Sequence, residues 1–177
     1  SQCMECHTEA AGFALGPEHG QLNKDFSYPS TGRTANQLAT ADAVDLLAVP
    51  LPDDPANLVR FSDPADATEP LEARARAYLH SNCAGCHRPG GPTPSNMDLR
   101  YQTAFADTNT CNVVPLSGRL GLPGALIVTP GDGGQSILIE RMARRDVHSM
   151  PPLGSTIVDA AGVQLLTDWV NSLGGCP

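Results

Sequence analysis

The chain has 177 residues, with 11 Lys and Arg against 19 Asp and Glu, so its formal net charge is -8. This charge argues against binding to nucleic acid or to an anionic membrane surface, and it favours a protein partner that presents a basic patch. Only 5% of the residues are aromatic, whereas Gly and Pro number 17 and 16, so we expect long loops around a small hydrophobic core. No apolar run approaches the ~20 residues that a membrane-spanning helix needs.

The chain begins with a Cys-x-x-Cys-His motif formed by Cys3, Cys6 and His7. This is the attachment pattern of a c-type haem. The two thiols add across the haem vinyl groups, and the adjacent His is held beneath the iron as its proximal ligand. The remainder of residues 1–33 is rich in Gly and Pro, which predicts irregular backbone around the cofactor.

A first helix is predicted from about residue 34 to residue 47. Thr34 is a suitable N-cap, and Gln37 stands three residues later at the capping-box position. Residues 48–70 then combine several prolines with many aspartates, which predicts an extended linker. We therefore predict a division into an N-terminal haem-binding segment, residues 1–69, and a second domain, residues 70–177.

The second domain opens with a better-marked helix. Pro70 suits a first helical turn, and an apolar stripe follows at helical spacing. The stripe consists of Leu71, Ala75, Tyr78 and Leu79. It runs directly into a second Cys-x-x-Cys-His motif, formed by Cys83, Cys86 and His87. Two copies of the pattern predict two c-type haems.

A zinc site and a redox-active dithiol are two other uses of such cysteines. A zinc site needs two ligand pairs around one tetrahedral ion, but the two motifs lie far apart in the sequence. A redox-active dithiol gives no reason for a His at the same place in both motifs. The repeated His therefore favours haem.

Residues 88–131 are again rich in Gly and Pro and predict loops. A short helix is expected from Ser136 to about Arg144, with Ile137, Leu138 and Met142 facing inward. The last helix should begin at the N-cap Asp159 and end before Gly174-Gly175. Its expected apolar face consists of Val163, Leu166, Trp169, Val170 and Leu173.

Cys111 and Cys176 remain after four cysteines are assigned to haem. An even remainder in an oxidising compartment predicts a disulfide, and two unrelated buried thiols are the alternative. Covalent haem attachment and a disulfide both indicate a periplasmic or extracellular location. The sequence looks like a mature, processed chain or a piece of a longer one.

The order of elements in residues 70–177 resembles the monohaem cytochrome c fold, in which the first and last helices cross beside the haem. In that fold a Met in a loop before the last helix binds the far side of the iron, a place that Met150 matches in Ser149-Met150-Pro151-Pro152. The resemblance implies a fold that is mainly α with extensive irregular loops: a cytochrome c-like domain preceded by a smaller haem-binding segment.

The whole chain also resembles a dihaem family of exported bacterial proteins, often appended to larger oxidoreductase or repeat domains. The resembling segments include Cys6-His7-Thr8, Asn36-Gln37-Leu38, Arg74-Ala75-Arg76-Ala77-Tyr78-Leu79-His80, Cys86-His87-Arg88-Pro89-Gly90-Gly91, Met97-Asp98-Leu99-Arg100, Arg141-Met142 and Met150-Pro151-Pro152-Leu153. Members of that family usually carry sequence before the first haem motif, of which almost none remains here. The resemblance carries no specific activity to this chain.

The axial ligands follow from position. We assign His87 and Met150 to the second haem. Met150 differs from the other methionines in its spacing from His87 and in the two prolines that follow it. The other methionines, Met4, Met97 and Met142, suit packing. The first haem has no Met available, so His80, one turn before Cys83, is the preferred sixth ligand.

Other histidines stay open for that position. His19 lies close enough in sequence to fold back, and a histidine of a neighbouring subunit is a further choice. His148 is expected to contact solvent or a haem propionate.

A haem iron with six ligands has no open position for substrate, so it carries electrons. The predicted function is therefore electron transfer between redox partner proteins through two covalently bound haems, not catalysis. Two alternatives remain: a dihaem peroxidase in which one haem lacks a sixth ligand, and a polymer whose subunits associate haem to haem.

Overall fold

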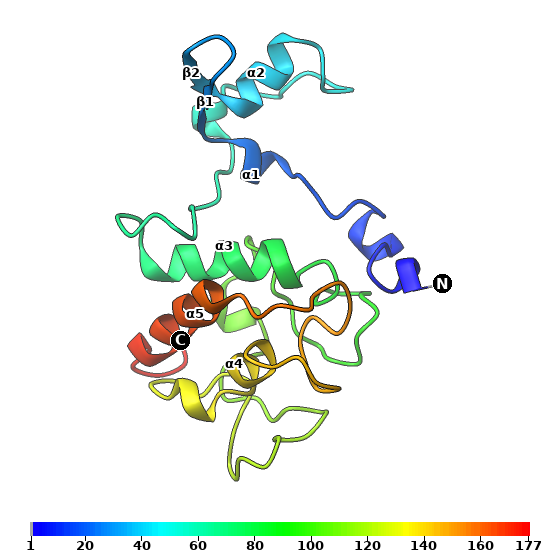
Figure 1. The fold of residues 1–177 in the computed structure, drawn as a ribbon, viewed down its shortest axis with the longest axis vertical. Helices are drawn as coiled ribbons and strands as arrows, with labels where there is room; N and C mark the ends of the chain where they lie inside the picture. The colour runs from blue at the N-terminus through cyan, green and yellow to red at the C-terminus, as the bar shows by residue number, and fades with distance from the viewer. Residues whose placement is uncertain (1) are drawn as a thin grey trace. The chain divides into compact units, whose positions relative to one another are not determined.

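The computed structural model describes residues 2–177, which form two compact units. One unit is Gly16–Ser62, and the other joins the residues up to Leu15 to Asp63–Pro177 (Figure 1). This division differs from the predicted boundary at residue 70. The first Cys-x-x-Cys-His motif belongs with the second motif, in the larger unit, because residues 5–15 pack against the loop that follows the second motif.

The smaller unit contains two short helices, α1 and α2, and a two-stranded antiparallel sheet. The elements are α1 (His19–Leu22), β1 (Asp25–Tyr28), β2 (Arg33–Asn36), α2 (Gln37–Ala43) and a 3-10 turn (Pro55–Asn57). The hairpin lies partly where irregular backbone was expected. Thr34 is on β2, opposite Ser27, and the N-cap of α2 is Asn36, whose side chain accepts a hydrogen bond from the amide of Ala39. The helix ends at Ala43, short of residue 47.

The segment expected to be a linker is folded onto the smaller unit. The side chain of Asn23, which is buried, donates to the carbonyls of Pro55, Leu58 and Val59 at 2.7, 3.2 and 3.3 Å. Asn23 also accepts a hydrogen bond from the side chain of Asn36 at 2.8 Å. One amide side chain thus ties the proline-rich stretch to the start of α2, a role that composition alone does not reveal.

The larger unit is built on three helices joined by long loops. These are α3 (Leu71–Cys83), α4 (Ile137–Met142) and α5 (Ala160–Ser172). Short 3-10 helices lie at Gln2–Glu5, Glu9–Ala11, Phe105–Asp107 and Gly133–Gln135. All three predicted helices are confirmed, with α4 shorter than expected at both ends. Among residues 2–177, none of the helices is long and apolar enough to cross a membrane.

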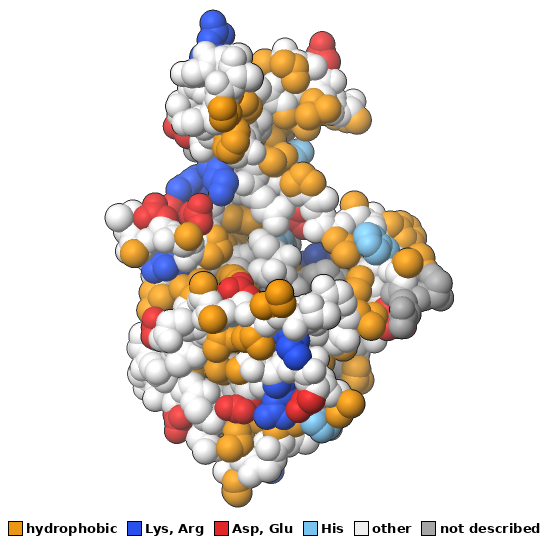
Figure 2. All heavy atoms as spheres, in the orientation of Figure 1, with side chains coloured by type: hydrophobic (Ala, Val, Ile, Leu, Met, Phe, Trp, Pro, Cys, Tyr) orange, Lys and Arg blue, Asp and Glu red, His pale blue; other side chains and the backbone are white. Residues whose placement is uncertain are grey.

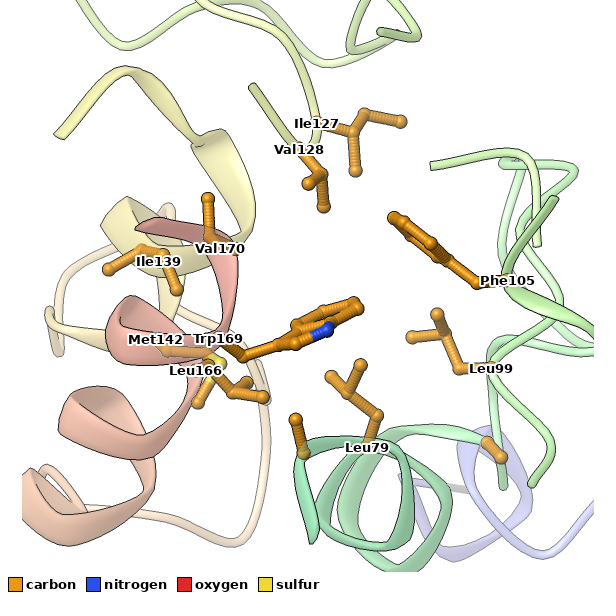
Figure 3. Close-up of a cluster of buried hydrophobic side chains, with 12 residues drawn as sticks. Leu79, Leu99, Phe105, Ile127, Val128, Ile139, Met142, Leu166, Trp169 and Val170 are labelled. Carbon is orange, nitrogen blue, oxygen red and sulfur yellow. The ribbon is translucent and has the colours of Figure 1, made fainter. Parts of the chain in front are cut away.

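Helices α3 and α5 pack directly against each other, and Trp169 lies at the centre of the core beside them. Figure 3 shows the ring of Trp169 between Leu79 of α3 and the side chains of Phe105 and Val128 from the loops. The rings of Phe105 and Trp169 meet edge to face with centroids 5.0 Å apart, a favourable arrangement for aromatic pairs. The expected inward face of α5 is confirmed at Leu166, Trp169 and Val170.

The contact between α3 and α5 depends on Gly162. A Cβ atom at this position would lie 2.2 Å from ring atoms of Tyr78, so only glycine lets the two helices approach as they do. The Tyr78 hydroxyl donates to Asp159 at 2.9 Å, and Asp159 caps α5 by accepting from the amide of Gly162 at 3.0 Å. The predicted N-cap is confirmed. The order helix, motif, loops, short helix, Met loop and final helix is observed, while the likeness to cytochrome c stays a prediction.

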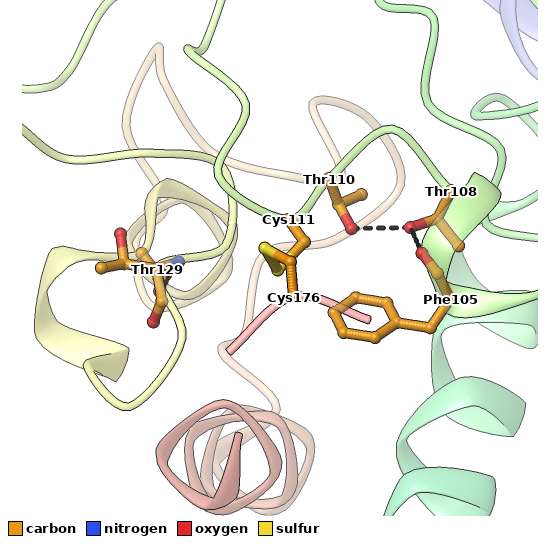
Figure 4. Close-up of a disulfide and its surroundings, with 7 residues drawn as sticks. Phe105, Thr108, Thr110, Cys111, Thr129 and Cys176 are labelled. Atoms are coloured by element: carbon orange, nitrogen blue, oxygen red, sulfur yellow. Dashed lines mark hydrogen bonds between the residues drawn. A yellow bond between two sulfur atoms is a disulfide. The ribbon is translucent and has the colours of Figure 1, made fainter. Parts of the chain in front are cut away.

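Cys111 and Cys176 form the predicted disulfide, with their Cα atoms 5.8 Å apart (Figure 4). Cys111 follows a buried pair of threonines whose hydroxyls, on Thr108 and Thr110, lie 2.8 Å apart. Thr108 also donates to the carbonyl of Phe105 at 2.7 Å. The bond therefore attaches the segment that follows α5 to a loop that is itself anchored beside the core.

Candidate haem-attachment site

The second motif forms a tight turn at the end of α3. The amides of Cys86 and His87 both donate to the carbonyl of Cys83, at 3.1 and 2.9 Å. Further along, a Cβ atom on Gly91 would lie 2.1 Å from the carbonyl oxygen of Cys86, so the returning loop can pass only with glycine there. The carbonyl of His87 accepts from the amide of Leu99 at 2.9 Å, which fixes the residue that ends the motif.

The first motif adopts the same turn. The amides of Cys6 and His7 both donate to the carbonyl of Cys3, at 3.3 and 3.0 Å. Both motifs therefore have the same local hydrogen-bond pattern although one follows a 13-residue helix and the other a short 3-10 turn. The pattern places the two thiols and the imidazole of each motif on one short loop.

An apolar cavity of about 260 Å³ opens beside the second motif. Its lining includes Cys83, His87 and Met150, which are the residues assigned to the second haem except Cys86. Apolar side chains from α3, α4 and the loops complete it, among them Leu79, Met97, Leu99, Ile127, Leu138 and Met142. The structure thus brings His87 and Met150 to one cavity, although they lie far apart in the sequence.

The imidazole of His87 is suited to ligation. Burial lowers its pKa below the ordinary value, so the ring is neutral at neutral pH and keeps a lone pair. Its Nδ1 atom is buried, and no hydrogen-bond partner lies near it among the described residues. A buried polar atom without a partner is uncommon in a native protein, and this one belongs to a residue that lines the cavity.

Met150 lies in the loop between α4 and α5. Its amide donates to the carbonyl of Arg141 at 2.9 Å, which attaches the loop to α4. Met97 and Met142 also line the cavity, so the sequence-based view of them as packing residues understated how close they come to the site. Met142 is largely buried in the core, and Met150 is half-buried.

The imidazole of His7 has a different partner. Its Nδ1 lies 2.6 Å from the carbonyl oxygen of Phe13, which can only accept, so Nδ1 carries the proton. The other nitrogen, Nε2, then holds the lone pair. This is the arrangement found around metal-binding histidines, where a backbone carbonyl orients the ring through its second nitrogen. The ring itself is exposed.

The two motifs meet within the larger unit. The thiol of Cys86 lies 3.8 Å from the carbonyl oxygen of Glu5 and forms a hydrogen bond with the thiol of Cys6. Arg88 reinforces the contact, because its side chain donates to the carbonyl of Ala10 at 3.1 Å and also to that of Ala84. One attachment cysteine from each motif therefore faces the other.

The thiols of the second motif do not have the lowered pKa of a redox-active dithiol. Burial raises the pKa of Cys83 to about 12, with the neighbouring Cys86 adding to the effect. Burial also raises the pKa of Cys86, and the nearby Cys6 raises it further. Redox-active dithiols work with a thiol whose pKa is lowered, so the site lacks the electrostatics that this alternative needs.

His80, predicted to be the sixth ligand of the first haem, is buried on α3 with 6% of its surface exposed. Its Nδ1 accepts a hydrogen bond from the amide of Tyr101 at 2.9 Å. An amide can only donate, so a neutral His80 carries its proton on Nε2 and has no lone pair there for iron. The assignment of His80 as the sixth ligand stays a prediction. It requires the hydrogen bond from the Tyr101 amide to break, so that the proton can move to Nδ1 and free Nε2 for the iron.

The other histidines lie elsewhere. His19 is exposed in the smaller unit, where it begins α1. His148 is exposed, with its amide donating to Asp146 at 2.9 Å and its carbonyl accepting from Arg141 at 3.0 Å. Among residues 2–177, no group of three His, Cys, Asp or Glu side chains is arranged to hold a metal ion.

Arg88 and Arg141 are the site residues to which sequence reasoning gave no role, although both stand in segments that carry the family resemblance. Both side chains donate to backbone carbonyls, a use that leaves no pattern in the sequence. Both stand next to residues already of interest, Arg88 directly after His87 and Arg141 directly before Met142.

Comparison with protein-family models, with curated proteins and with solved structures found no match to the chain.

Proposed function

We propose that the chain is an electron-transfer protein that binds two c-type haems, one at each Cys-x-x-Cys-His motif. The observation that carries the proposal is the repeated turn: in both motifs the second Cys and the His donate to the carbonyl of the first Cys. A zinc site or a single dithiol does not explain two such turns, each ending in a His. Haem supplies one-electron chemistry, and the protein's part is to hold and orient it.

The residues around the second motif fit this group. Cys83 and Cys86 would form the two thioether bonds. Cys83 lines the apolar cavity, and so does His87, whose ring is neutral. Met150 lines the same cavity and is proposed as the second axial ligand. The large apolar lining suits a porphyrin, and it would keep water away from the iron.

The residues around the first motif fit less completely. His7 is oriented by the carbonyl of Phe13 with its Nε2 lone pair available, which supports its role as proximal ligand. Its exposure supports this motif as the point where electrons enter. Met ligation raises a haem's reduction potential relative to bis-His ligation, so electrons are proposed to come to rest at the site of His87 and Met150.

The contact between the motifs supports transfer inside the protein. Cys6 and Cys86 would each carry the edge of one haem, and their thiols lie side by side. Two haem edges joined at neighbouring sulfur atoms exchange electrons quickly, without a moving loop. The proposed partners are redox proteins with a basic patch, and self-association that brings haems together remains open.

The net charge of the chain supports a partner with a basic patch, but the distribution of charged side chains on the surface does not point to one docking face. The chain has a formal net charge of -8, and the haem propionates would add to it. On the face drawn in Figure 2, however, Asp and Glu side chains are scattered among Lys and Arg. The proposed location is periplasmic or extracellular, which the disulfide between Cys111 and Cys176 supports.

Counting haems in variants tests the proposal. The chain is produced with haem-attachment machinery, and its mass and absorption spectrum are measured. Two covalently bound haems are expected in the unmodified protein. Replacing Cys3 and Cys6 with Ala should remove one, and replacing Cys83 and Cys86 should remove the other. A protein that matures without covalent haem would refute the proposal.

A second candidate is an enzyme whose first haem has an open position, such as a peroxidase. It is favoured by the hydrogen bond from the amide of Tyr101 to Nδ1 of His80. This bond places the proton of the neutral ring on Nε2, so neither nitrogen has a free lone pair for iron. The spectrum decides between the two. A low-spin first haem that becomes high-spin and binds cyanide in His80→Ala supports the carrier.

A high-spin signal already present in the unmodified protein supports the enzyme. A low-spin spectrum that His80→Ala leaves unchanged shifts the ligand to His19 or to a neighbouring subunit. The same replacement at His19 then separates these last two.

A further inference from the structure

Arg141 connects three parts of the cavity wall. It lies on α4 and lines the cavity together with Ser117 and Met150. Its Nη2 donates to the carbonyl of Ser117 at 2.9 Å, and its Nη1 donates to the carbonyl of His148 at 3.0 Å. Its own carbonyl accepts from the amide of Met150 at 2.9 Å. One residue therefore ties two loops to a helix around a single cavity.

We propose that Arg141 is the positioning residue that holds Met150 at the iron of the second haem. This inference rests on the proposed function, because it concerns the residue assigned there as axial ligand. Arg141 itself does not touch the iron. It acts by fixing the loop at and just before Met150, through its side chain at His148 and through its backbone carbonyl at Met150.

The loop needs such a tie. Its apolar side chains do not anchor it well, since Val147 is 93% exposed and Ile157 is 82% exposed. A thioether is a weak, neutral ligand, so the iron alone does not fix a mobile loop. Each backbone hydrogen bond that holds the loop reduces the entropy lost when Met150 binds.

An arginine suits this task for a geometric reason. Its guanidinium is a rigid fork whose separate nitrogens can donate to two carbonyls at once, and it stays charged at all relevant pH values. Hydrogen bonds from a charged donor are also stronger than neutral ones. Lysine has a single ammonium group on a flexible stem, so it can keep the charge but not the fixed span between Ser117 and His148.

A purely electrostatic role is the competing explanation. A positive charge beside the cavity would change the reduction potential of the second haem even if it did not hold the loop. The two roles separate in Arg141→Lys, which keeps the charge but loses the fork. Positioning predicts that Lys restores little of the Met ligation, and a charge effect predicts that it restores all of it.

The experiment uses the holoprotein and titrates it with imidazole, which competes with Met150 for the iron. The readout is the Met–iron charge-transfer band, which only a Met-bound haem gives. We expect half-loss of the band at an imidazole concentration about tenfold lower in Arg141→Ala than in the unmodified protein, equivalent to about 1.4 kcal/mol. Hydrogen exchange in residues 146–150 should be faster in the same variant.

Arg74→Ala is the matched control. Arg74 is likewise a half-buried arginine on a helix, and it donates twice to the carbonyl of Pro64, at 3.1 and 2.9 Å, but it does not line the cavity. It should titrate like the unmodified protein. Equal titrations for Arg141→Ala and the unmodified protein would overturn the inference, as would full restoration by Arg141→Lys.

The unmodified protein separates the two proposals. If it lacks the charge-transfer band, the assignment of Met150 in the proposed function fails. Hydrogen exchange then still tests Arg141, because its side chain holds the loop through the carbonyl of His148 whatever binds the iron. Unchanged exchange in Arg141→Ala would overturn the positioning role independently.

Discussion

Replacing both Cys111 and Cys176 with Ala should cost the larger unit several kcal/mol of stability. The two residues are 65 positions apart, so the bond closes a long loop in the unfolded chain. In the chain-entropy account, closing a loop of this length lowers the unfolded-state entropy enough to contribute about 4 kcal/mol at 25 °C. Cys111 also packs against the hydrophobic core, so some contact energy is lost as well.

The measurement is urea unfolding of the holoprotein, followed by circular dichroism. Besides the lower free energy of unfolding, we expect a steeper dependence on urea, because the unlinked chain exposes more surface when it unfolds. Mild thiol reductants provide a control without substitution, since they cleave the disulfide but not the thioether bonds to haem. A loss below about 1 kcal/mol, or no change in slope, would refute the reasoning from loop closure.

Three further substitutions test residues that line the cavity or stand next to its lining in the sequence. The Arg100 guanidinium, 2.6 Å from Asp98, is the main reason that the pKa of Asp98 falls from 3.8 to about 2. Because this pKa is lowered in the folded state, the ionised Asp98 stabilises the fold by about 2 kcal/mol above pH 4, and this stabilisation is lost as the pH falls toward 2. In urea unfolding, Asp98→Asn should therefore be less stable than the unmodified protein by that amount at pH 7 but not at pH 2. Met150→His should lower the second haem's potential and abolish the Met–iron band, whereas Met142→Leu, a volume-conserving change, should keep it. A Met150→His spectrum like that of the unmodified protein would show that the ligand is misassigned.

The parts of the fold that the sequence predicts well are those set by local chemistry. Asp159 caps α5 as expected, because an N-cap needs only a short acceptor side chain at the right place. The inward face of α5 follows from spacing, since a helix repeats every 3.6 residues whatever surrounds it. On α4 the expectation holds for Ile137 and Met142, whereas Leu138 is half-buried and Ile139 is buried although it was not expected to be. The disulfide followed from counting, because the predicted haem attachment would use four of the six cysteines.

The parts that were missed depend on contacts between distant residues. Thr34 is a good cap by composition, but pairing of β2 with β1 places it on a strand, and Asn36 takes over the cap. The proline-rich stretch was expected to be a linker, but the side chain of Asn23 holds it through three carbonyls. A side chain that binds backbone groups far along the chain gives no periodic pattern, so sequence spacing cannot find it.

At the candidate site, the sequence likewise does not reveal which nitrogen of a histidine carries the proton. His7 and His80 are both assigned to the first haem, yet their backbone partners are opposite in kind. The carbonyl of Phe13 accepts from His7 Nδ1 and leaves a lone pair on Nε2, whereas the amide of Tyr101 donates to His80 Nδ1 and places the proton on Nε2. Assigning ligands by elimination counts histidines but does not see which nitrogen holds the proton. The hydrogen bond at Tyr101 therefore has to break if His80 is the sixth ligand of the first haem, and it can persist if His19, a histidine of a neighbouring subunit or no protein group takes that position.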